Sequence, residues 1–290
     1  MKVGEVGDKL VASPLARGAG AAMSLVRADG FCVIPQNSEG VEAGDTVDVE
    51  LYRSLEEIGS TAVAIGSHDL ILDVMADLLP CMYPGNYLSS THVGSMGGLM
   101  ALKRGEAHLA PTHLLDEETG EYNIAILKKL FAGEKMALVK GVERIQGIIV
   151  KKGNPLGIHE IEDLRGLNYV NRQRGAGTRV LFDYKLKEAG ISPEEIHGYD
   201  REAATHMAVA AAVSGGDADA GMGIQSAARA MGLDFIEIGR EEYDFAIPVR
   251  FLDFPPVQHF LAVLKSREFA ERVEKLGGYG LARTGEILYL

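Results

Sequence analysis

The chain of 290 residues carries 29 lysines and arginines against 41 aspartates and glutamates, which gives a formal net charge of −12. This charge repels nucleic acids and anionic lipids and excludes them as broad electrostatic partners. Hydrophobic residues make up 47% and charged residues 24%, a composition that predicts a folded globular protein and excludes a disordered one. A small anion can still bind locally, where amides or cations gather.

The cysteines and the first residues indicate the compartment. Cys32 and Cys81 stand in unrelated contexts without metal-ligand spacing, so we expect buried free thiols rather than a disulfide or a zinc site. Met1 to Ala16 lacks the apolar core of a secretory signal, and no stretch reaches the about 18 apolar residues of a membrane span. We therefore expect a cytoplasmic protein without a membrane partner.

The N-terminal segment is typical of a small β module. Asp29-Gly30 precedes the apolar run Phe31–Pro35, and Gly44-Asp45 precedes Thr46–Leu51. Such dipeptides beside alternating hydrophobic residues indicate hairpins. A module of about 50 residues is near the lower size limit for independent folding, so we expect it to rely on a neighbour.

From Ala62 onward, short apolar strands alternate with helical patterns. This alternation predicts parallel sheets with ligand loops at the carboxyl ends of the strands. The phrases at 104–110 and 214–221 both combine a helix end, a glycine turn and a small-residue strand, which predicts two similar lobes. Strands are expected at 63–65, 87–93, 108–113, 147–150, 168–170 and 218–223, and helices at 70–78, 99–103, 180–189 and 206–213.

The strongest local signal is the phrase Asn171–Arg179 at a strand-to-helix junction. Its arginines, glycines and Thr178 offer charged donors, backbone N–H groups, a hydroxyl and the positive end of a helix dipole, which together predict an anion site. The alternative is a solvated basic loop in which Thr178 caps the helix. No GK[ST] and no third glycine follow, so a nucleotide loop is not indicated.

Ser67 and Ser95 follow strands at the starts of two further helices. Together they form a second group of anion donors, although each alone would more often be an N-cap. Ser67, His68 and Asp69 are adjacent in sequence, so they do not build a catalytic relay, and no G-x-S-x-G motif is present. The scattered histidines form no metal-ligand set, and the acidic run at Asp116 is expected to be a solvated loop.

These phrases carry a resemblance. From Gly66 to about Glu286, the chain resembles the periplasmic-binding-protein-like domain that is fused to molybdopterin molybdenumtransferases of the MoeA type and to some molybdate-type helix-turn-helix regulators. The phrases are Gly66–Asp69, Val93–Gly98, His113–Asp116, Gly120–Asn123, Asn171–Arg179 and Gly277–Tyr279.

Residues Pro14 to Leu51 resemble the C-terminal β-domain of the same transferase. The phrases Arg17–Gly20, Arg27–Gly30 and Ile34–Gly40 carry this part of the resemblance. The large central domain with the metal-insertion chemistry is expected to be absent, and even the β-domain is expected to lack its first strands. We therefore expect no catalysis by this chain alone.

The resemblance implies an α/β fold of the type II periplasmic-binding-protein kind, a two-lobed clamshell behind a small N-terminal β module. The module is expected at 1–53 and the binding-protein domain at 60–290, with one lobe at 60–140 and 247–290 and the other at 141–246. Such proteins close on an oxyanion with hydroxyls, amides and an arginine. The expected ligand-binding residues are Ser67, His68, Thr91, Ser95, His113, Arg174, Gly177, Thr178 and Arg179.

By the same resemblance, the expected ligand is molybdate or tungstate, captured for molybdenum-cofactor biosynthesis or its regulation, and no resident cofactor is expected. A pterin, a thiolated precursor or an amino acid would use the same donors. Two rival functions stay open: a molybdenumtransferase whose catalytic domain is on another chain, and a ligand-sensing module. The partners expected are a small anion, a molybdenumtransferase or other cofactor-synthesis protein, and a second copy of the chain docked through the N-terminal module.

Overall fold

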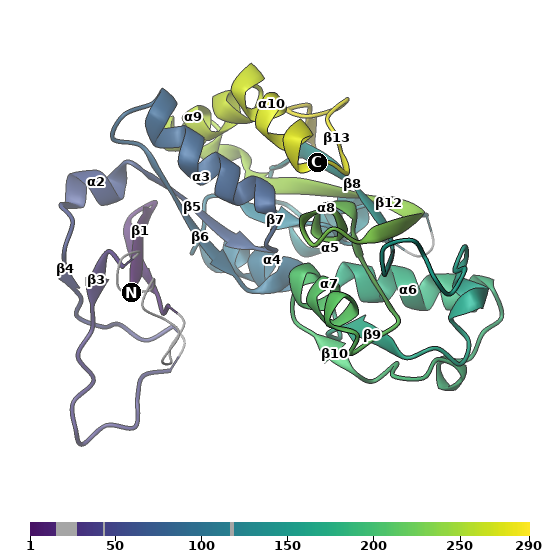
Figure 1. The fold of residues 1–290 in the computed structure, drawn as a ribbon. Helices are drawn as coiled ribbons and strands as arrows, with labels where there is room; N and C mark the ends of the chain where they lie inside the picture. The colour runs from purple at the N-terminus through teal and green to yellow at the C-terminus, as the bar shows by residue number, and fades with distance from the viewer. Residues whose placement is uncertain (16–27, 43, 117–118) are drawn as a thin grey trace. The chain divides into compact units, whose positions relative to one another are not determined.

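The computed structural model describes residues 1–15, 28–42, 44–116 and 119–290. The chain adopts a mixed α/β fold, as the alternating pattern predicts (Figure 1). It divides into unit 1, of Met1–Ala110 and Ile247–Val263, and unit 2, of Pro111–Ala246 and Leu264–Leu290. The expected domain and lobe boundaries stay predictions. The expected phrase Arg17–Gly20 and the acidic residues 117 and 118 lie outside the described residues.

Unit 1 contains a parallel strand pair with a helix packed on each strand. β5 (Thr61–Gly66) and β6 (Tyr87–His92) pair in parallel along their full lengths. α3 (Leu70–Met82) packs on β6 and α4 (Gly94–Arg104) packs on β5. The other elements are β1 (Lys2–Val6), β2 (Lys9–Ser13), β3 (Gly30–Phe31), β4 (Glu50–Leu51), α2 (Leu55–Gly59), a 3-10 helix (Val249–Phe251) and α9 (Pro255–Leu264), whose last residue belongs to unit 2.

The N-terminal β module differs in detail from its expected form. β1 and β2 form an antiparallel hairpin around Gly7, whose φ of 61° favours glycine, and the sequence pattern did not indicate this hairpin. The strands expected at 31–35 and 46–51 are reduced to β3 and β4, which pair over two residues each. Pro35 has no N–H to donate to a ladder, which weakens the longer strand that the apolar run predicted.

Asp29 joins the parts of the module. Its carboxylate is 1% exposed and accepts bonds from the Val3 N–H at 2.9 Å, from Arg53 Nη1 at 2.9 Å and from Lys2 Nζ at 3.1 Å. Burial raises the pKa of Asp29, but these bonds and the charge of Lys2 outweigh burial and hold the pKa below its ordinary value. β1 in turn packs on β5, where a Cβ on Gly4 would lie 2.2 Å from a valine methyl.

The cysteines do not occupy the expected buried positions. Cys32 is half-buried and Cys81 is exposed near the end of α3. Cys81 stands two residues after buried Leu79, which places it on the other side of the helix. No helix in the described ranges combines the length and apolar character that a membrane crossing requires. The expected cytoplasmic location stays a prediction.

His108 is a neutral core histidine of unit 1. It is 1% exposed, and its Nδ1 accepts the Val63 N–H at 3.0 Å. The rings of Phe251 and Phe254 lie against it at centroid distances of 4.9 and 4.6 Å. Burial lowers the pKa of His108 from 6.5 to about 4.

We expect acid to destabilise the protein through His108. The unfolded state binds the proton first, so stability that is present above pH 6.5 is lost as the pH falls toward about 4. The full loss amounts to about 3 kcal/mol. Urea unfolding across this pH range measures it. The variant His108→Asn keeps an acceptor for the Val63 N–H but does not titrate, and an equally steep pH dependence in that variant would refute the assignment.

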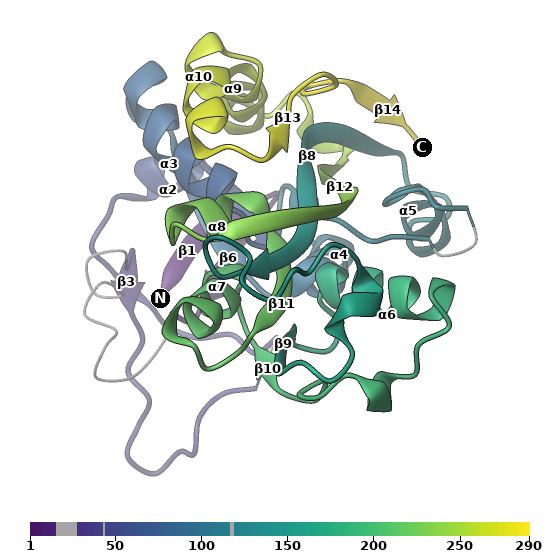
Figure 2. The ribbon, with the colours of Figure 1, turned by 45° about the vertical axis from the view of Figure 1, so that its right-hand side comes forward.

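Unit 2 contains most of one large sheet with the strand order β10-β9-β11-β8-β12-β7, and β13 and β14 also pair with β8. β8 (Met136–Val150) and β12 (Asp234–Pro248) are the long central strands of this sheet (Figure 2). The first residue of β7 and the last two residues of β12 belong to unit 1. The other elements are β7 (Ala110–Thr112), α5 (Ile124–Leu130), β9 (Tyr169–Arg172), α6 (Gly177–Glu188), β10 (Glu202–Ala203), α7 (His206–Gly215), β11 (Ala220–Ile224), α8 (Gln225–Ala230), α10 (Arg267–Leu276), β13 (Tyr279–Gly280), β14 (Ile287–Tyr289) and 3-10 helices at Ile161–Leu164 and Pro193–Glu195.

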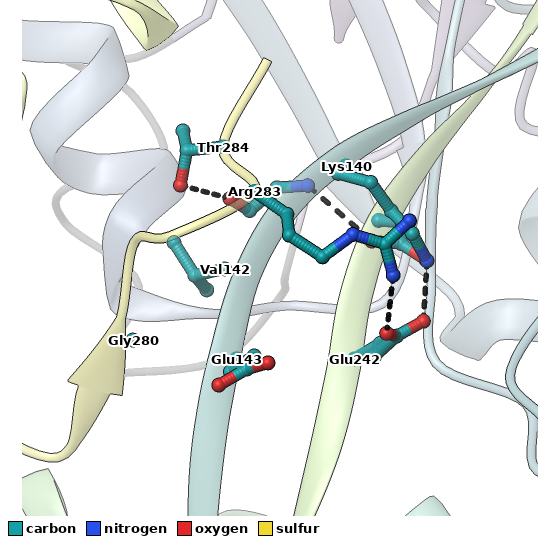
Figure 3. A pocket seen from close by; sticks show the side chains of 9 residues that line it. Lys140, Val142, Glu143, Glu242, Gly280, Arg283 and Thr284 are labelled. Atoms are coloured by element: carbon teal, nitrogen blue, oxygen red, sulfur yellow. Dashed lines mark hydrogen bonds and ion pairs between the residues drawn. The ribbon is translucent and has the colours of Figure 1, made fainter. Parts of the chain in front are cut away.

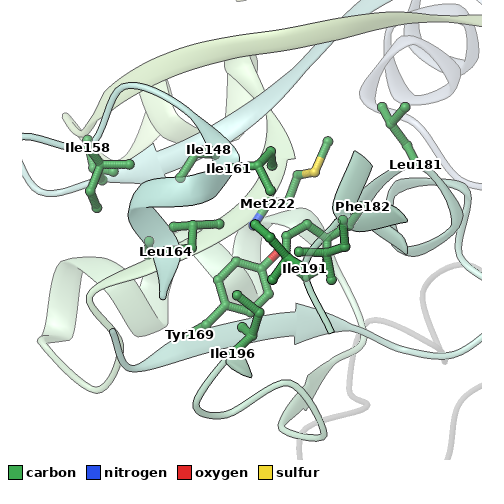
Figure 4. Packing of buried hydrophobic residues seen from close by; sticks show 13 residues of the cluster. Ile148, Ile158, Ile161, Leu164, Tyr169, Leu181, Phe182, Ile191, Ile196 and Met222 are labelled. Atoms are coloured by element: carbon green, nitrogen blue, oxygen red, sulfur yellow. The ribbon is translucent and has the colours of Figure 1, made fainter. Parts of the chain in front are cut away.

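A buried cluster fixes β9 and α6 to one another in unit 2 (Figure 4). The ring of Tyr169 stacks on Phe182 at a centroid distance of 4.6 Å, and its hydroxyl accepts the Met222 N–H at 3.1 Å. This core determines where the loop between β9 and α6 lies. The cluster also includes Ile148, Ile158, Ile161, Leu164, Leu181, Ile191 and Ile196.

The two repeated phrases form the same local structure, as expected. α4 ends at Gly105 with φ of 71°, and α7 ends at Gly216 with φ of 83°. The next N–H bonds back to the helix in both cases, from Glu106 to Ala101 O and from Asp217 to Ala212 O, each at 2.9 Å. This left-handed cap favours glycine and turns the chain into the following strand.

Candidate functional site

Unit 1 brings its predicted residues to one edge of the strand pair. In the parallel register, Ile65 lies opposite Thr91 and Gly66 lies opposite His92, so the two strands end level. A Cβ on Gly98 of α4 would sit 2.4 Å from Ile65 O and 2.5 Å from Gly66 Cα. Glycine therefore lets the first turn of α4 lie directly on the end of β5.

Neither predicted serine caps a helix. Asp69 is the N-cap of α3, where its carboxylate accepts the Ile71 N–H at 2.9 Å. Val93 stands at the N-cap of α4 and contributes no side-chain bond. Ser67 and Ser95 are both buried, with 9% and 7% of their surface exposed. The interpretation of these serines as caps is therefore wrong, and their hydroxyls lie at the starts of α3 and α4.

Two imidazoles stand at the same edge of unit 1. The rings of His68 and His92 are 4.3 Å apart between centroids. His68 Nε2 lies 3.4 Å from Asp73 Oδ2, and His92 Nε2 lies 2.9 Å from Ser90 Oγ. Thr91 directly precedes His92 in the chain and is half-buried. This edge of unit 1 therefore carries imidazole and carboxylate groups as well as the hydroxyls of Ser67, Thr91 and Ser95.

In unit 2, the predicted anion loop presents the N-terminal end of α6. Ala176 is the N-cap, so Thr178 does not cap the helix. Thr178 Oγ1 instead donates to Gln146 Oε1 on β8 at 3.2 Å. Gln146 is 0% exposed, and its Nε2 has no hydrogen-bond partner among the residues that the structure describes. A buried amide donor beside a helix N-terminus is suited to an anion, because the helix N–H groups and dipole favour negative charge there.

The predicted residues His113 and Gly177 are in direct contact at this helix start. A Cβ on Gly177 would lie 2.3 Å from His113 Nδ1, so glycine allows α6 to begin against the imidazole ring. The same Nδ1 lies 3.7 Å from Glu241 Oε2, and the ring stacks with Tyr243 at a centroid distance of 6.1 Å. The structure thus brings His113, Gly177 and Thr178 together.

Arg144 and Glu241 form a buried ion pair between β8 and β12. Their side chains are each 1% exposed. The Arg144 guanidinium also lies over the Tyr243 ring, 4.7 Å from its centroid. Neither residue belongs to a motif that the sequence alone marks as a binding site.

Arg172, at the end of β9, is a second buried cation. It is 8% exposed and forms no ion pair with any described residue; its guanidinium donates to the carbonyls of Ala203 and Ala204 at 3.2 Å and lies 2.9 Å from His206 Nδ1. Burial and the charge of Arg144 lower the pKa of Arg172 to about 10, so Arg172 stays charged at neutral pH. The charge of Glu241, which pairs with Arg144, also acts on Arg172 and favours its charged form.

The predicted arginines Arg174 and Arg179 have carboxylate neighbours. The Arg174 side chain is 80% exposed and lies 3.7 Å from Asp200 and from Glu202. The Arg179 side chain is 5% exposed, with Nε 3.3 Å from Asp183 Oδ1. Among the described residues, neither arginine forms a hydrogen bond with Thr178 or Gln146.

The sequence did contain a signal for the missed residues. Lys140, Arg144 and Gln146 stand at even positions of β8 and are all buried, whereas Glu143 at an odd position is half-buried. Because a strand alternates its faces, this spacing marks one polar stripe in a buried sheet. Within the described residues, no group of three or more His, Cys, Asp or Glu side chains is placed to hold a metal ion.

Sequence comparisons recover both parts of the chain. A model of the PBP superfamily domain matches residues 77–265, and a model of the MoeA C-terminal region (domain IV) matches residues 1–52. The uncharacterized protein YvgK of Bacillus subtilis (strain 168) is 32% identical over 238 residues, which are 81% of this chain and 76% of that protein. These matches give no support to a fusion with a molybdenumtransferase.

Solved structures show the fold of type II periplasmic binding proteins, as the sequence predicts. An ABC-type phosphate transport receptor from Vibrio cholerae is 18% identical, covers 75% of this chain and 98% of its own, and has a TM-score of 0.52. The tungstate ABC transporter structure from Geobacter sulfurreducens is 12% identical, with coverages of 74% and 98% and a TM-score of 0.55. The amino acid ABC transporter substrate-binding protein AbpA from Streptococcus pneumoniae, bound to L-arginine, is 13% identical, with coverages of 77% and 96% and a TM-score of 0.51.

Proposed function

The chain belongs to the PBP superfamily, and from that premise we propose that it is a substrate-binding protein that captures a small oxyanion, molybdate or tungstate. The observation that carries the proposal is the start of α6, where the buried amide nitrogen of Gln146 has no partner among the described residues. An oxyanion there would accept bonds from this amide and from the helix N–H groups, while the Thr178 hydroxyl, which donates to Gln146 Oε1, turns the amide nitrogen toward the anion.

The charge balance of unit 2 supports an anion rather than a neutral ligand. Arg144 is paired with Glu241, whereas Arg172 is buried, charged and without an ion pair among the described residues. A buried charge without a counter-charge is costly, and an anionic ligand would supply the missing negative charge. This local excess exists in a chain whose formal net charge is −12, so it serves a small anion rather than a polyanion.

The residues of unit 1 provide a second set of donors in this proposal. We assign ligand-facing roles to the hydroxyls of Ser67, Thr91 and Ser95 and to the imidazole of His68. In unit 2, we assign to His113 and Gly177 the shape of the helix start, and to Thr178 the orientation of the Gln146 amide. The sequence predicts that Arg174 and Arg179 also bind the ligand, and this stays a prediction to be tested.

The match of residues 1–52 to the MoeA C-terminal region supports a role in molybdenum-cofactor biosynthesis or its regulation. A phosphate or the carboxylate of an amino acid would use the same donors, so both belong among the ligands to be tested.

The match of residues 1–52 also favours a second candidate function, a molybdenumtransferase component whose catalytic domain is on another chain. Metal-transfer assays with and without a molybdenumtransferase would detect that activity, and a ligand-dependent pull-down would detect a sensor.

Calorimetry on the purified chain tests the ligand. We expect tungstate and molybdate to bind more tightly than phosphate or L-arginine. Thr178→Val should weaken tungstate binding by about five- to tenfold, because it removes the hydrogen bond that orients the Gln146 amide toward the anion. Thr284→Val is the matched control, since Thr284 Oγ1 donates to Gly141 O at 2.7 Å, away from the start of α6. Native mass spectrometry of protein purified without added oxyanion should show bound molybdate or tungstate. Tighter binding of L-arginine than of either oxyanion would refute the proposal.

A further inference from the structure

A buried carboxamide holds both neighbours of His113. Asn123 is 1% exposed, and its Oδ1 accepts the Leu114 N–H at 2.7 Å and the Thr112 hydroxyl at 3.2 Å. Thr112 and Leu114 flank His113 directly in the chain. One oxygen atom therefore anchors the segment on either side of the histidine that contacts Gly177.

The orientation of this carboxamide is set by Asp244 on β12. Asn123 Nδ2 donates to Asp244 Oδ2 at 2.9 Å, and Lys140 Nζ donates to the same oxygen at 2.8 Å. The Asp244 carboxylate also accepts the Gly141 N–H at 3.3 Å. A charged carboxylate only accepts hydrogen bonds, so the amide nitrogen of Asn123 faces Asp244 and the oxygen faces the segment with His113.

Lys140 is itself held from a second side, at a shallow pocket beside β8 and β12 (Figure 3). Its ammonium pairs with Glu242, which also lies 3.3 Å from Arg283 Nη1. Burial raises the pKa of Asp244, although the charge and hydrogen bond of Lys140 act against that rise. The network from Arg283 through Lys140 to Asp244 thus gives Asn123 a fixed partner.

The backbone at Asn123 is in an uncommon conformation. Its φ is 69°, in the left-handed region where a residue with a side chain is strained by about 1 kcal/mol or more. Glycine would adopt this conformation without strain. Asparagine adopts such a backbone more readily than most other residues with a side chain, and here its side chain also bonds to Thr112, Leu114 and Asp244.

We propose that Asn123 is a positioning residue for anion binding, which sets His113 against the start of α6. The proposal rests on the proposed function, because His113 and Gly177 belong to the assigned anion site. Asp244 and Lys140 act through Asn123 and do not touch the ligand.

Asn123→Gly tests this role, because it keeps the left-handed backbone and removes only the side-chain bonds. The matched control is Asn154→Gly, since Asn154 is the other non-glycine residue of the described chain at positive φ, 43°. Among the residues that the structure describes, the side chain of Asn154 bonds to the backbone of Ile158 alone. We expect Asn123→Gly to raise the Kd for tungstate about tenfold or more, and Asn154→Gly to change it by less than about twofold.

A readout independent of ligand separates positioning from stability. In the absence of any oxyanion, the NMR signals of the His113 ring should shift in Asn123→Gly and stay in place in Asn154→Gly, even where both variants lower Tm. Thr112→Val removes one of the two bonds to Asn123 Oδ1 and serves as a milder variant if Asn123→Gly does not fold. Absence of tungstate binding by the unaltered chain would refute the proposed function, while the His113 signals would still test positioning. Unchanged His113 signals in both Asn123→Gly and Thr112→Val would overturn the inference.

Discussion

Replacing Glu241 by glutamine is expected to lower the free energy of unfolding by about 3–5 kcal/mol. The Glu241 side chain is 1% exposed and pairs with Arg144, which is equally buried. Glutamine keeps the size of the side chain but removes its charge, so Arg144 would lose this buried carboxylate and the favourable effect of its charge on Arg172 would disappear. Burial of an unpaired charge is costly because water no longer solvates it. Urea unfolding at about pH 7 measures the loss.

Glu143→Gln is the matched control for this variant. Glu143 lies on β8 beside Arg144, but its side chain is 35% exposed and lies 3.7 Å from Arg240, which is 59% exposed. An exposed pair contributes about 0–1 kcal/mol, so the control should be close to the unaltered protein. Sulfate or tungstate should stabilise Glu241→Gln more than the unaltered protein, because an anion would compensate the two arginines. Equal stability of the two variants would show that Glu241 does not balance these charges.

The sequence predicted the parts of the fold that local patterns determine. The parallel order of β5 and β6 followed from two short apolar strands that each lead into a helix. The ends of α4 and α7 followed from Gly105 and Gly216, because a left-handed cap needs glycine. Ser67 and Ser95 were expected at helix starts, and they lie there without capping.

Features that depend on distant residues were not predicted. β8 was expected only at its end, 147–150, because Lys140, Gly141 and Glu143 interrupt the apolar pattern before it. Gly141 admits the neighbouring strand: a Cβ on this residue would lie 2.3 Å from Tyr243 O. The pairing of Arg144 with Glu241 likewise joins two strands that are far apart in the chain. Local patterns carry no information on which buried cation meets which carboxylate.

Arg172 and Arg174 stand two residues apart in opposite environments, and their variants are expected to differ in tungstate affinity. Arg172 is 8% exposed, whereas the Arg174 side chain is 80% exposed and lies near Asp200 and Glu202. A buried cation acts on an anion with little screening by water or salt. Arg172→Gln should therefore weaken tungstate binding by about ten- to a hundredfold, a loss of about 1.5–3 kcal/mol.

Arg174→Ala provides the comparison, because the sequence alone predicts that this variant loses about one to two decades of affinity with an unchanged Tm. The exposure of Arg174 and its two acidic neighbours reduce that expectation to less than about fivefold, and the effect should fade as salt is raised toward about 1 M. Calorimetric titrations of both variants with tungstate at low and high salt measure the difference. A larger loss in Arg174→Ala than in Arg172→Gln would place the anion at the exposed loop. The buried charge beside α6 would then have a purely structural role, since Arg172 would be stabilised by the carbonyls that already accept its bonds.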